Sequence, residues 1–146
     1  MTLNDFLEAI AGVLTTLWPG RTVEVDEIPT GADGNFYVGI IESNQDKRLD
    51  RRRRRLVQFQ VLYFLADDDA MAWNDWAESM YKNFEKLTVA DGTTSGRIVH
   101  LTGQTARREQ GQRFFQFLFN ADVLILKEPE ADEVMENLEM SEGIKE

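Results

Sequence analysis

The alternation of apolar and polar side chains predicts a long strand that begins in a run of arginines. Residues 51–55 are five consecutive arginines, and beyond them an apolar residue occupies every second position as far as residue 65. A period of two is typical of a strand with one buried face, and aromatic and β-branched side chains favour that structure. The alternating residues are Val57, Phe59, Val61, Tyr63 and Leu65. We expect the remaining elements to pack around this strand.

Two segments show the spacing of three or four residues that marks one face of a helix. In the first, residues 2–18, Thr2 and Asp5 form a capping-box pattern at the start, and Pro19–Gly20 stops the helix. Its apolar stripe consists of Leu3, Phe6, Leu7, Ile10, Leu14 and Leu17. The second helix extends from Asp68 to Leu87, and its stripe consists of Trp73, Trp76, Ala77, Met80, Phe84 and Leu87. Both helices are therefore predicted to be amphipathic.

Further strands are predicted on both sides of these elements. They are Thr22–Ile28, Asn35–Glu42, Arg97–Glu109 and Gln112–Leu126. The last two form a hairpin with Gln110–Gly111 at its turn. The polar stretch Ser43–Arg52 interrupts the alternation, so we expect it to form a long hairpin tip.

The last predicted strand is apolar on both faces. One face carries Phe115, Phe117, Phe119, Ala121, Val123 and Ile125, and the other carries Phe114, Leu118, Leu124 and Leu126. This indicates a second packing surface, against either the helices or another subunit. The fold class is then α+β: a mostly antiparallel sheet of about five strands with two main helices on one face. We expect one domain over residues 1–126 and an acidic segment, residues 127–146, that is either a short helix or disordered.

Charge is distributed unevenly along the chain. The net charge is −10. Residues 127–146 hold eight acids against two lysines, a local −6, whereas residues 47–55 hold seven bases against one acid, a local +6. The molecule is therefore an electrostatic dipole.

The arginine run has three interpretations. It is a solvated hairpin arm, a nucleic-acid contact, or a protein contact in which guanidinium groups pair with carboxylates. The −10 total opposes binding to free DNA. For a protein contact, the carboxylates belong to a neighbouring subunit, and the acidic segment of this chain is an available partner.

Catalytic and cofactor chemistry finds little support. The chain has no cysteine, which excludes disulfides, thiolate zinc sites and cysteine nucleophiles. The single histidine, His100, follows a strand pattern and has no sequence partner for a base or ligand role. Asp67, Asp68 and Asp69 could hold a divalent cation, but capping the following helix is the simpler role. We expect no enzyme activity, no cofactor and no metal.

Two further features have ordinary explanations. Trp73 and Trp76 fit core packing, the alternative being that one of them anchors an interface. Lys82 and Lys86 fit the end of the second helix, where cations are favoured. No apolar run approaches the roughly 20 residues needed to span a bilayer, so no membrane partner is expected.

Several phrases of the sequence resemble one protein family. They are LNDFLEAIAGVLTTLWPG, VEVDEI, NFYVGIIES, RRRRRLVQFQVLYF, DWAESMYKNFEKL and FFQFLFNADVLILKEPE. In this order, over residues 1–130, the chain is similar to the tail terminator proteins of tailed bacteriophages and related prophage elements, especially those of Gram-positive hosts. The arginine run is longer and more basic than the family pattern requires.

The resemblance implies a structural virion protein without catalytic residues. Family members form a ring, usually a hexamer, on the head-proximal end of the tail tube, stop its polymerisation and present a docking surface to the neck or head. The implied partners are further copies of the chain, the tail tube protein, a sheath protein in contractile particles, and a neck or head-completion protein, with DNA only as cargo passing through the ring. The implied location is the virion tail or a tail-like particle, assembled in the host cytoplasm.

Two groups of residues are predicted to form interfaces. They are Lys47, Arg48, Arg51, Arg52, Arg53, Arg54 and Arg55 in the basic stretch, and Glu109, Gln110, Gln112 and Arg113 at the predicted hairpin turn. Opposite local charges allow head-to-tail pairing of identical subunits. A neck or head-completion protein and a small nucleic-acid-binding regulator are the alternative functions.

Overall fold

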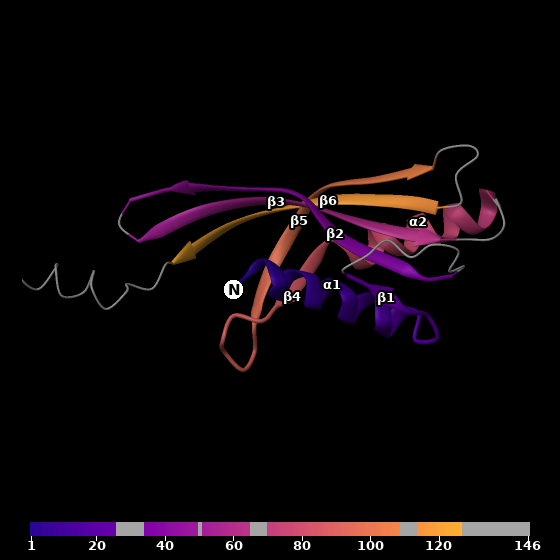
Figure 1. Ribbon diagram of the computed structural model, residues 1–146, viewed down its shortest axis with the longest axis horizontal. Coiled ribbons are helices and arrows are strands. Elements are labelled where there is room, and N and C mark those ends of the chain that lie inside the picture. The colour runs from indigo at the N-terminus through magenta and orange to yellow at the C-terminus, as the bar shows by residue number, and fades with distance from the viewer. Residues whose placement is uncertain (26–33, 50, 65–69, 109–113, 127–146) are drawn as a thin grey trace, which may run out of the picture.

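The computed structural model describes residues 1–25, 34–49, 51–64, 70–108 and 114–126 (Figure 1). The elements are α1 (Leu3–Leu17), β1 (Val23–Glu24), β2 (Phe36–Lys47), β3 (Arg52–Phe64), α2 (Ala70–Asn83), β4 (Lys86–Val89), β5 (Arg97–Arg108) and β6 (Phe114–Leu126). In this part of the chain the strands form one sheet in the order β1-β2-β3-β6-β5-β4. Every pair is antiparallel except β1 with β2, which is parallel. The α+β class is confirmed, but the sheet has six strands rather than five.

One face of the sheet and both helices enclose an aromatic core. On α1, Phe6 packs on Phe59 of β3 with ring centroids 5.4 Å apart. On α2, Trp76 stacks on Tyr63 of the same strand at 5.6 Å. Because side chains two apart in a strand share a face, both helices lie on one side of the sheet, as Figure 1 shows. The predicted packing of two helices on one face is confirmed.

The start of α1 follows the predicted capping box. The Thr2 hydroxyl accepts the Asp5 N–H at 3.2 Å, and the Asp5 carboxylate accepts the Thr2 N–H at 2.7 Å. These bonds satisfy backbone donors that no helical carbonyl reaches. They also hold the pKa of Asp5 below its usual value, with the backbone bond to Thr2 as the largest cause.

The end of the second helix differs from the prediction. α2 stops at Asn83, and Leu87 lies on β4, where buried Leu87 and Val89 alternate with exposed Lys86 and Thr88. The apolar spacing of Phe84 and Leu87 fits one more turn of helix as well as it fits a turn followed by a short strand. The sequence pattern therefore could not distinguish the two structures. Lys82 does lie in the last turn of α2, but Lys86 does not.

The second predicted strand is longer than expected. β2 continues through Ser43 to Lys47, and these residues pair with Arg53–Val57 of β3 instead of forming a loop. The register shifts by one residue between Ile40 and Glu42, so this part of the strand begins after a bulge. Its side chains are exposed, and backbone pairing rather than burial maintains the strand. The polar composition of Ser43–Lys47 therefore gave no alternating pattern from which this part of the strand could be predicted.

A bend in β5 separates the sheet into a core and a projecting arm. β5 pairs with β4 at residues 97–100 and with β6 only from Leu101 onward, leaving Asp122–Leu126 without β5 beside them. The bend includes Gly103, whose φ of 64° favours glycine and where a Cβ would lie 2.5 Å from the Asn120 amide nitrogen. We call residues 43–47, 52–56 and 122–126 the arm. It is three strands wide and extends to the left in Figure 1.

Candidate interaction surface

The register of three strands fixes which side chains share the outer face of the arm, the face directed away from the helices. Asn44, Leu56 and Asp122 lie in one row across β2, β3 and β6. The next row toward the tip holds Asp46, Arg54 and Leu124, and the last pairs Arg52 with Leu126. Side chains in neighbouring rows of one face are close enough to interact. The outer face therefore mixes leucines with charged groups.

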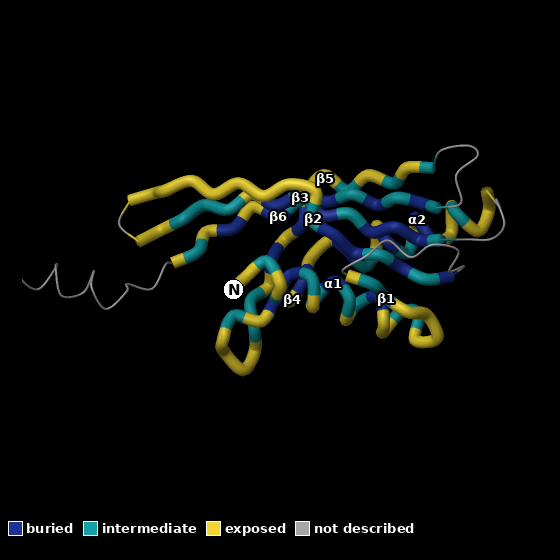
Figure 2. Tube along the Cα trace, viewed as in Figure 1, coloured by how far each residue is buried: buried dark blue, intermediate teal, exposed yellow. Residues whose placement is uncertain are grey.

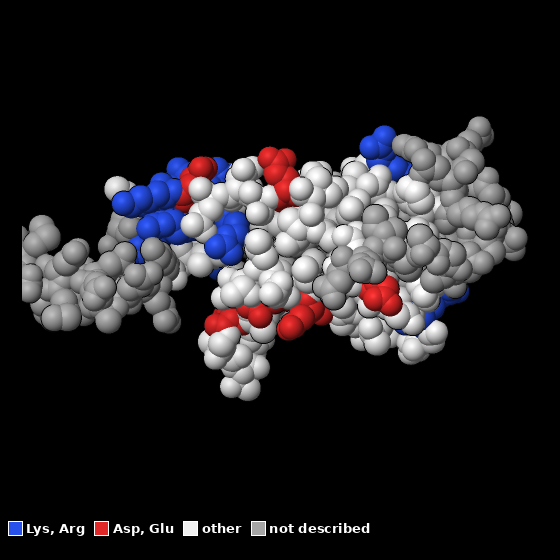
Figure 3. Space-filling model, in the orientation of Figure 1, with Lys and Arg blue, Asp and Glu red and all other residues white. Residues whose placement is uncertain are grey.

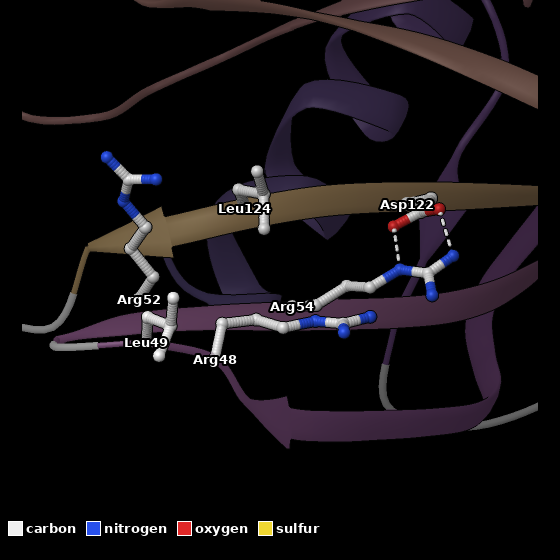
Figure 4. Close-up of a pocket in the computed structure, with 6 residues that line it drawn as sticks. All are labelled: Arg48, Leu49, Arg52, Arg54, Asp122 and Leu124. Atoms are coloured by element: carbon white, nitrogen blue, oxygen red, sulfur yellow. Dashed lines mark hydrogen bonds and ion pairs between the residues drawn. The ribbon is translucent and has the colours of Figure 1, made fainter.

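A hollow of about 650 Å³ opens on this outer face (Figure 4). Its lining residues are Arg48, Leu49, Arg52, Arg54, Asp122 and Leu124. In Figure 4 the Arg48 and Arg54 side chains extend toward Asp122, whereas that of Arg52 extends away from it. The hollow is thus lined by two leucines, three arginines and one aspartate.

One arginine of the run is held by an ion pair. Arg54 donates from Nε to Asp122 Oδ1 at 2.9 Å and from Nη2 to Oδ2 at 2.7 Å, a bidentate geometry across the diagonal of two strands. This hydrogen bonding lowers the pKa of Asp122 and raises that of Arg54. Because the two side chains are 36% and 46% exposed and solvent screens their charges, the pair orients Arg54 more than it stabilises the fold.

The remaining arginines of the strand point to different faces. Arg53 and Arg55 lie on the side that continues the core, opposite Ile125 and Val123. Arg55 donates twice to Gln45 Oε1, at 3.2 and 2.6 Å, and Arg53 donates to the Arg52 carbonyl at 3.0 Å. Figure 3 shows blue side chains gathered over the arm. The arginines of β3 are therefore divided between the two faces of the arm and do not form a one-sided patch.

The arm also exposes apolar surface. Leu49 at its tip is 88% exposed, and Leu126 and Leu124 on its outer face are 59% and 52% exposed. Figure 2 shows that the β2 edge of the arm is exposed as well, on the other side of β3 from β6. Leu124 and Leu126 were expected to belong to a second packing surface, and neither helix covers them. Exposed leucines rimmed by arginines are typical of a protein-binding surface.

The other predicted interface group lies outside the described residues. Glu109, Gln110, Gln112 and Arg113 fall between Arg108, where β5 ends, and Phe114, where β6 begins. Phe114 and Leu126 are the two ends of β6, whose 13 residues span about 40 Å. The strand ends that flank this group therefore lie far from the tip of the arm.

The remaining candidates have structural roles. Trp76 is buried and packs on Tyr63, and partly buried Trp73 packs edge-on against Phe115 at 5.9 Å, as core packing predicts. His100 is exposed on β5 opposite Lys86. The aspartates at 67–69 lie outside the described residues. Within the described ranges, no group of three histidine or acidic side chains is placed to hold a metal ion.

Sequence reasoning missed Leu49, Asp122 and Gln45 as parts of this surface. Leu49 is an isolated apolar residue in a basic stretch, and only the turn that it occupies exposes it beside the hollow. Asp122 was not singled out in the sequence, because its pairing with Arg54 depends on which strand lies beside β3. The arginine run and the two-sided apolar pattern of β6 were the signals in the sequence that pointed to this surface.

The fold and this surface define a small α+β protein whose distinctive exposed feature is a basic arm with an apolar outer face. Neither helix is long and apolar enough to cross a membrane, as judged over the described residues. The family model for phage tail terminator proteins matches residues 5–133, and the chain belongs to this family. It is thus a structural component of a virion tail. The family is structural rather than enzymatic, in agreement with the sequence-based expectation.

Other comparisons add little to this assignment. One solved structure is similar over 89% of this chain and 99% of its own length, with 15% identity and a TM-score of 0.49. No protein of curated function matches the chain. The expected type, from phages of Gram-positive hosts, stays a prediction.

Proposed function

We propose that this protein caps the head-proximal end of a phage tail tube, stops tube polymerisation and presents the docking surface for the neck or head. The family match over residues 5–133 is the observation that carries this proposal. The mechanism is surface complementarity: one face of the cap matches the last ring of the tube, and the opposite face does not accept another. Assembly takes place in the host cytoplasm, and the genome passes through the completed cap only as cargo.

The arm supports a second part of the proposal, the contact between subunits in a ring. Its two outer strands, β2 at residues 43–47 and β6 at residues 122–126, have no strand beside them on their outer edges among the described residues. Unpaired strand edges accept another chain. Basic side chains and exposed leucines on the same arm add charge and apolar area to that contact. A head-to-tail contact closes into a ring when the rotation between neighbouring subunits divides a full turn, and we propose that this one closes as a hexamer.

The hairpin between β5 and β6 then has a different partner from the arm. Because the flanking ends of β5 and β6 lie about 40 Å from the tip of the arm, one neighbour cannot contact both regions with a small interface. We assign Glu109–Arg113 to the tube or the neck, and the arm to the adjacent subunit.

The test is the length of tails made without this protein. Phage particles assembled from a genome with a stop codon early in its gene should contain overlong tubes, and supplying the wild-type protein should restore uniform length in electron micrographs. Tails of normal length would overturn the capping function. Normal tails that fail to join heads would instead favour a neck or head-completion protein.

A further inference from the structure

Several charged and apolar side chains at the outer face of the arm lack a partner among the described residues. Arg54 is occupied by Asp122, but the Arg48, Arg51 and Arg52 side chains have no ion-pair partner within the described ranges. Beside them, Leu49 and Leu124 line the hollow and remain more than half exposed. A ligand that fits this face must combine several carboxylates with a few apolar side chains.

Residues 127–146 of the same chain have this chemistry. They carry a net charge of −6 against the local +6 of residues 47–55. Within them, Val134, Met135 and Leu138 have the i, i+1, i+4 spacing of one helical face, and Glu133, Glu136 and Glu139 alternate with them. An apolar stripe flanked by acids is complementary to leucines flanked by arginines.

The last described residue before this segment lies beside a residue that lines the hollow. β6 ends at Leu126, which pairs with Arg52 and lies on the outer face itself. From Leu126, the eight residues to Val134 can extend up to about 28 Å. The five-residue length of the arm strands is only about 17 Å. The segment can therefore reach any part of the outer face of its own arm.

Tethering favours this contact over one with a second molecule. Two binding groups joined by a short stretch of one chain meet at an effective concentration that can reach the millimolar range. A segment on another subunit reaches that level only when the protein itself is that concentrated or is assembled in a ring. In the free protein, tethering thus favours the segment of the same chain over that of another molecule.

We propose that residues 127–146 bind the outer face of the arm of their own chain, with carboxylates on Arg48 and Arg52 and with Val134 and Leu138 against Leu49 and Leu124. The bound segment covers the surface that the adjacent subunit uses in the ring, a consequence that rests on the proposed function. It holds the free protein apart from other copies until the end of the tube displaces it. The contact itself does not depend on the role in tail assembly.

Paramagnetic relaxation in the isolated full-length protein tests the contact. Because the chain contains no cysteine, Ser141→Cys accepts a single spin label. At low salt the amide signals of Arg52–Leu56 and Asp122–Leu126 should lose more than half of their intensity, whereas Arg107 and Phe115 at the other end of the sheet keep theirs. The loss should diminish in about 0.5 M salt, where charges are screened. Undiminished arm signals at low salt would overturn the proposal.

Two control experiments show whether the loss of intensity comes from a contact within one chain and whether it depends on charge. In the first, spin-labelled protein without ¹⁵N is mixed with ¹⁵N protein that carries no spin label, and the arm signals should stay intact. Their loss would show a contact between molecules and refute the same-chain form.

In the second, charges are reversed. Arg48→Glu with Arg52→Glu should abolish the loss of intensity in the singly labelled protein, and adding Glu133→Lys with Glu136→Lys should restore it. Lys82→Glu with Arg107→Glu, the same charge change away from the arm, should leave it unchanged. Tail length does not enter any readout, so the capping function can fail while this contact stands, and the reverse.

Discussion

At the scale of single residues, strand register decides what each arginine of the run does. Arg54 and Asp122 are 68 positions apart in the sequence, and they meet because β6, not β5, lies beside β3. Arg55 meets Gln45 because the two are directly opposite in the β2–β3 pair. The sequence could predict that five arginines enter a strand, since alternation identifies the strand. It could not predict their partners, because no local pattern specifies which strands are neighbours.

The Arg54–Asp122 pair predicts an unusual titration of Asp122. Its folded-state pKa lies below the ordinary value because Arg54 hydrogen-bonds the ionised form. Any stability from the pair is therefore fully present above the ordinary aspartate pKa and is lost as the pH falls through the lowered one. Carboxyl ¹³C shifts should give a low midpoint for Asp122 that Arg54→Gln moves up toward the ordinary value. Arg107→Gln should not move it, and a wild-type midpoint at or above the ordinary value would contradict the pair.

At the scale of elements, the predictions succeeded where burial and period agree. Phe6, Ile10 and Leu14 are fully buried on α1, and Phe115, Phe117 and Phe119 are buried on β6, as their spacing indicates. The prediction failed where a strand is held by pairing alone, at Ser43–Lys47, or where a short strand continues a helical stripe, at Leu87. Two-residue β1 shows a third limit, because its parallel pairing with β2 is a tertiary contact.

The assignment of β4 as a strand makes a testable contrast between neighbours. Leu87→Ala should lower the free energy of unfolding by about 2–5 kcal/mol, because Leu87 is 1% exposed and its loss leaves a cavity. Thr88→Ala should change it by about 0.5 kcal/mol or less, because Thr88 faces outward on the strand. Denaturant unfolding measures both. In a helix continued from Met80 and Phe84, position 88 would share the buried face, so comparable losses for the two variants would refute the strand.

At the scale of the whole molecule, the basic residues form a projecting arm on an otherwise acidic protein. The sequence shows the uneven distribution of charge, but the arm itself, its bulge and its separation from the strand ends at Arg108 and Phe114 follow from the sheet. A surface that binds duplex DNA presents its cations together toward the phosphates. Here Arg53 and Arg55 lie on the face opposite Arg52 and Arg54, and Arg54 is already paired.

This division of the arginines, with the net charge of −10, predicts that the protein does not retain duplex DNA. A mobility-shift assay at about 50 mM salt, where phosphate contacts are strongest, should show no complex at micromolar protein. Asp122→Asn supplies a sharper form of the test, because it releases Arg54 and removes one negative charge. This variant should also form no complex with DNA, because the arginines of the run still lie on opposite faces of the arm. A complex whose affinity falls steeply with added salt would establish several phosphate contacts. That outcome would favour the nucleic-acid-binding regulator, and it would assign the arm to DNA instead of to a neighbouring subunit.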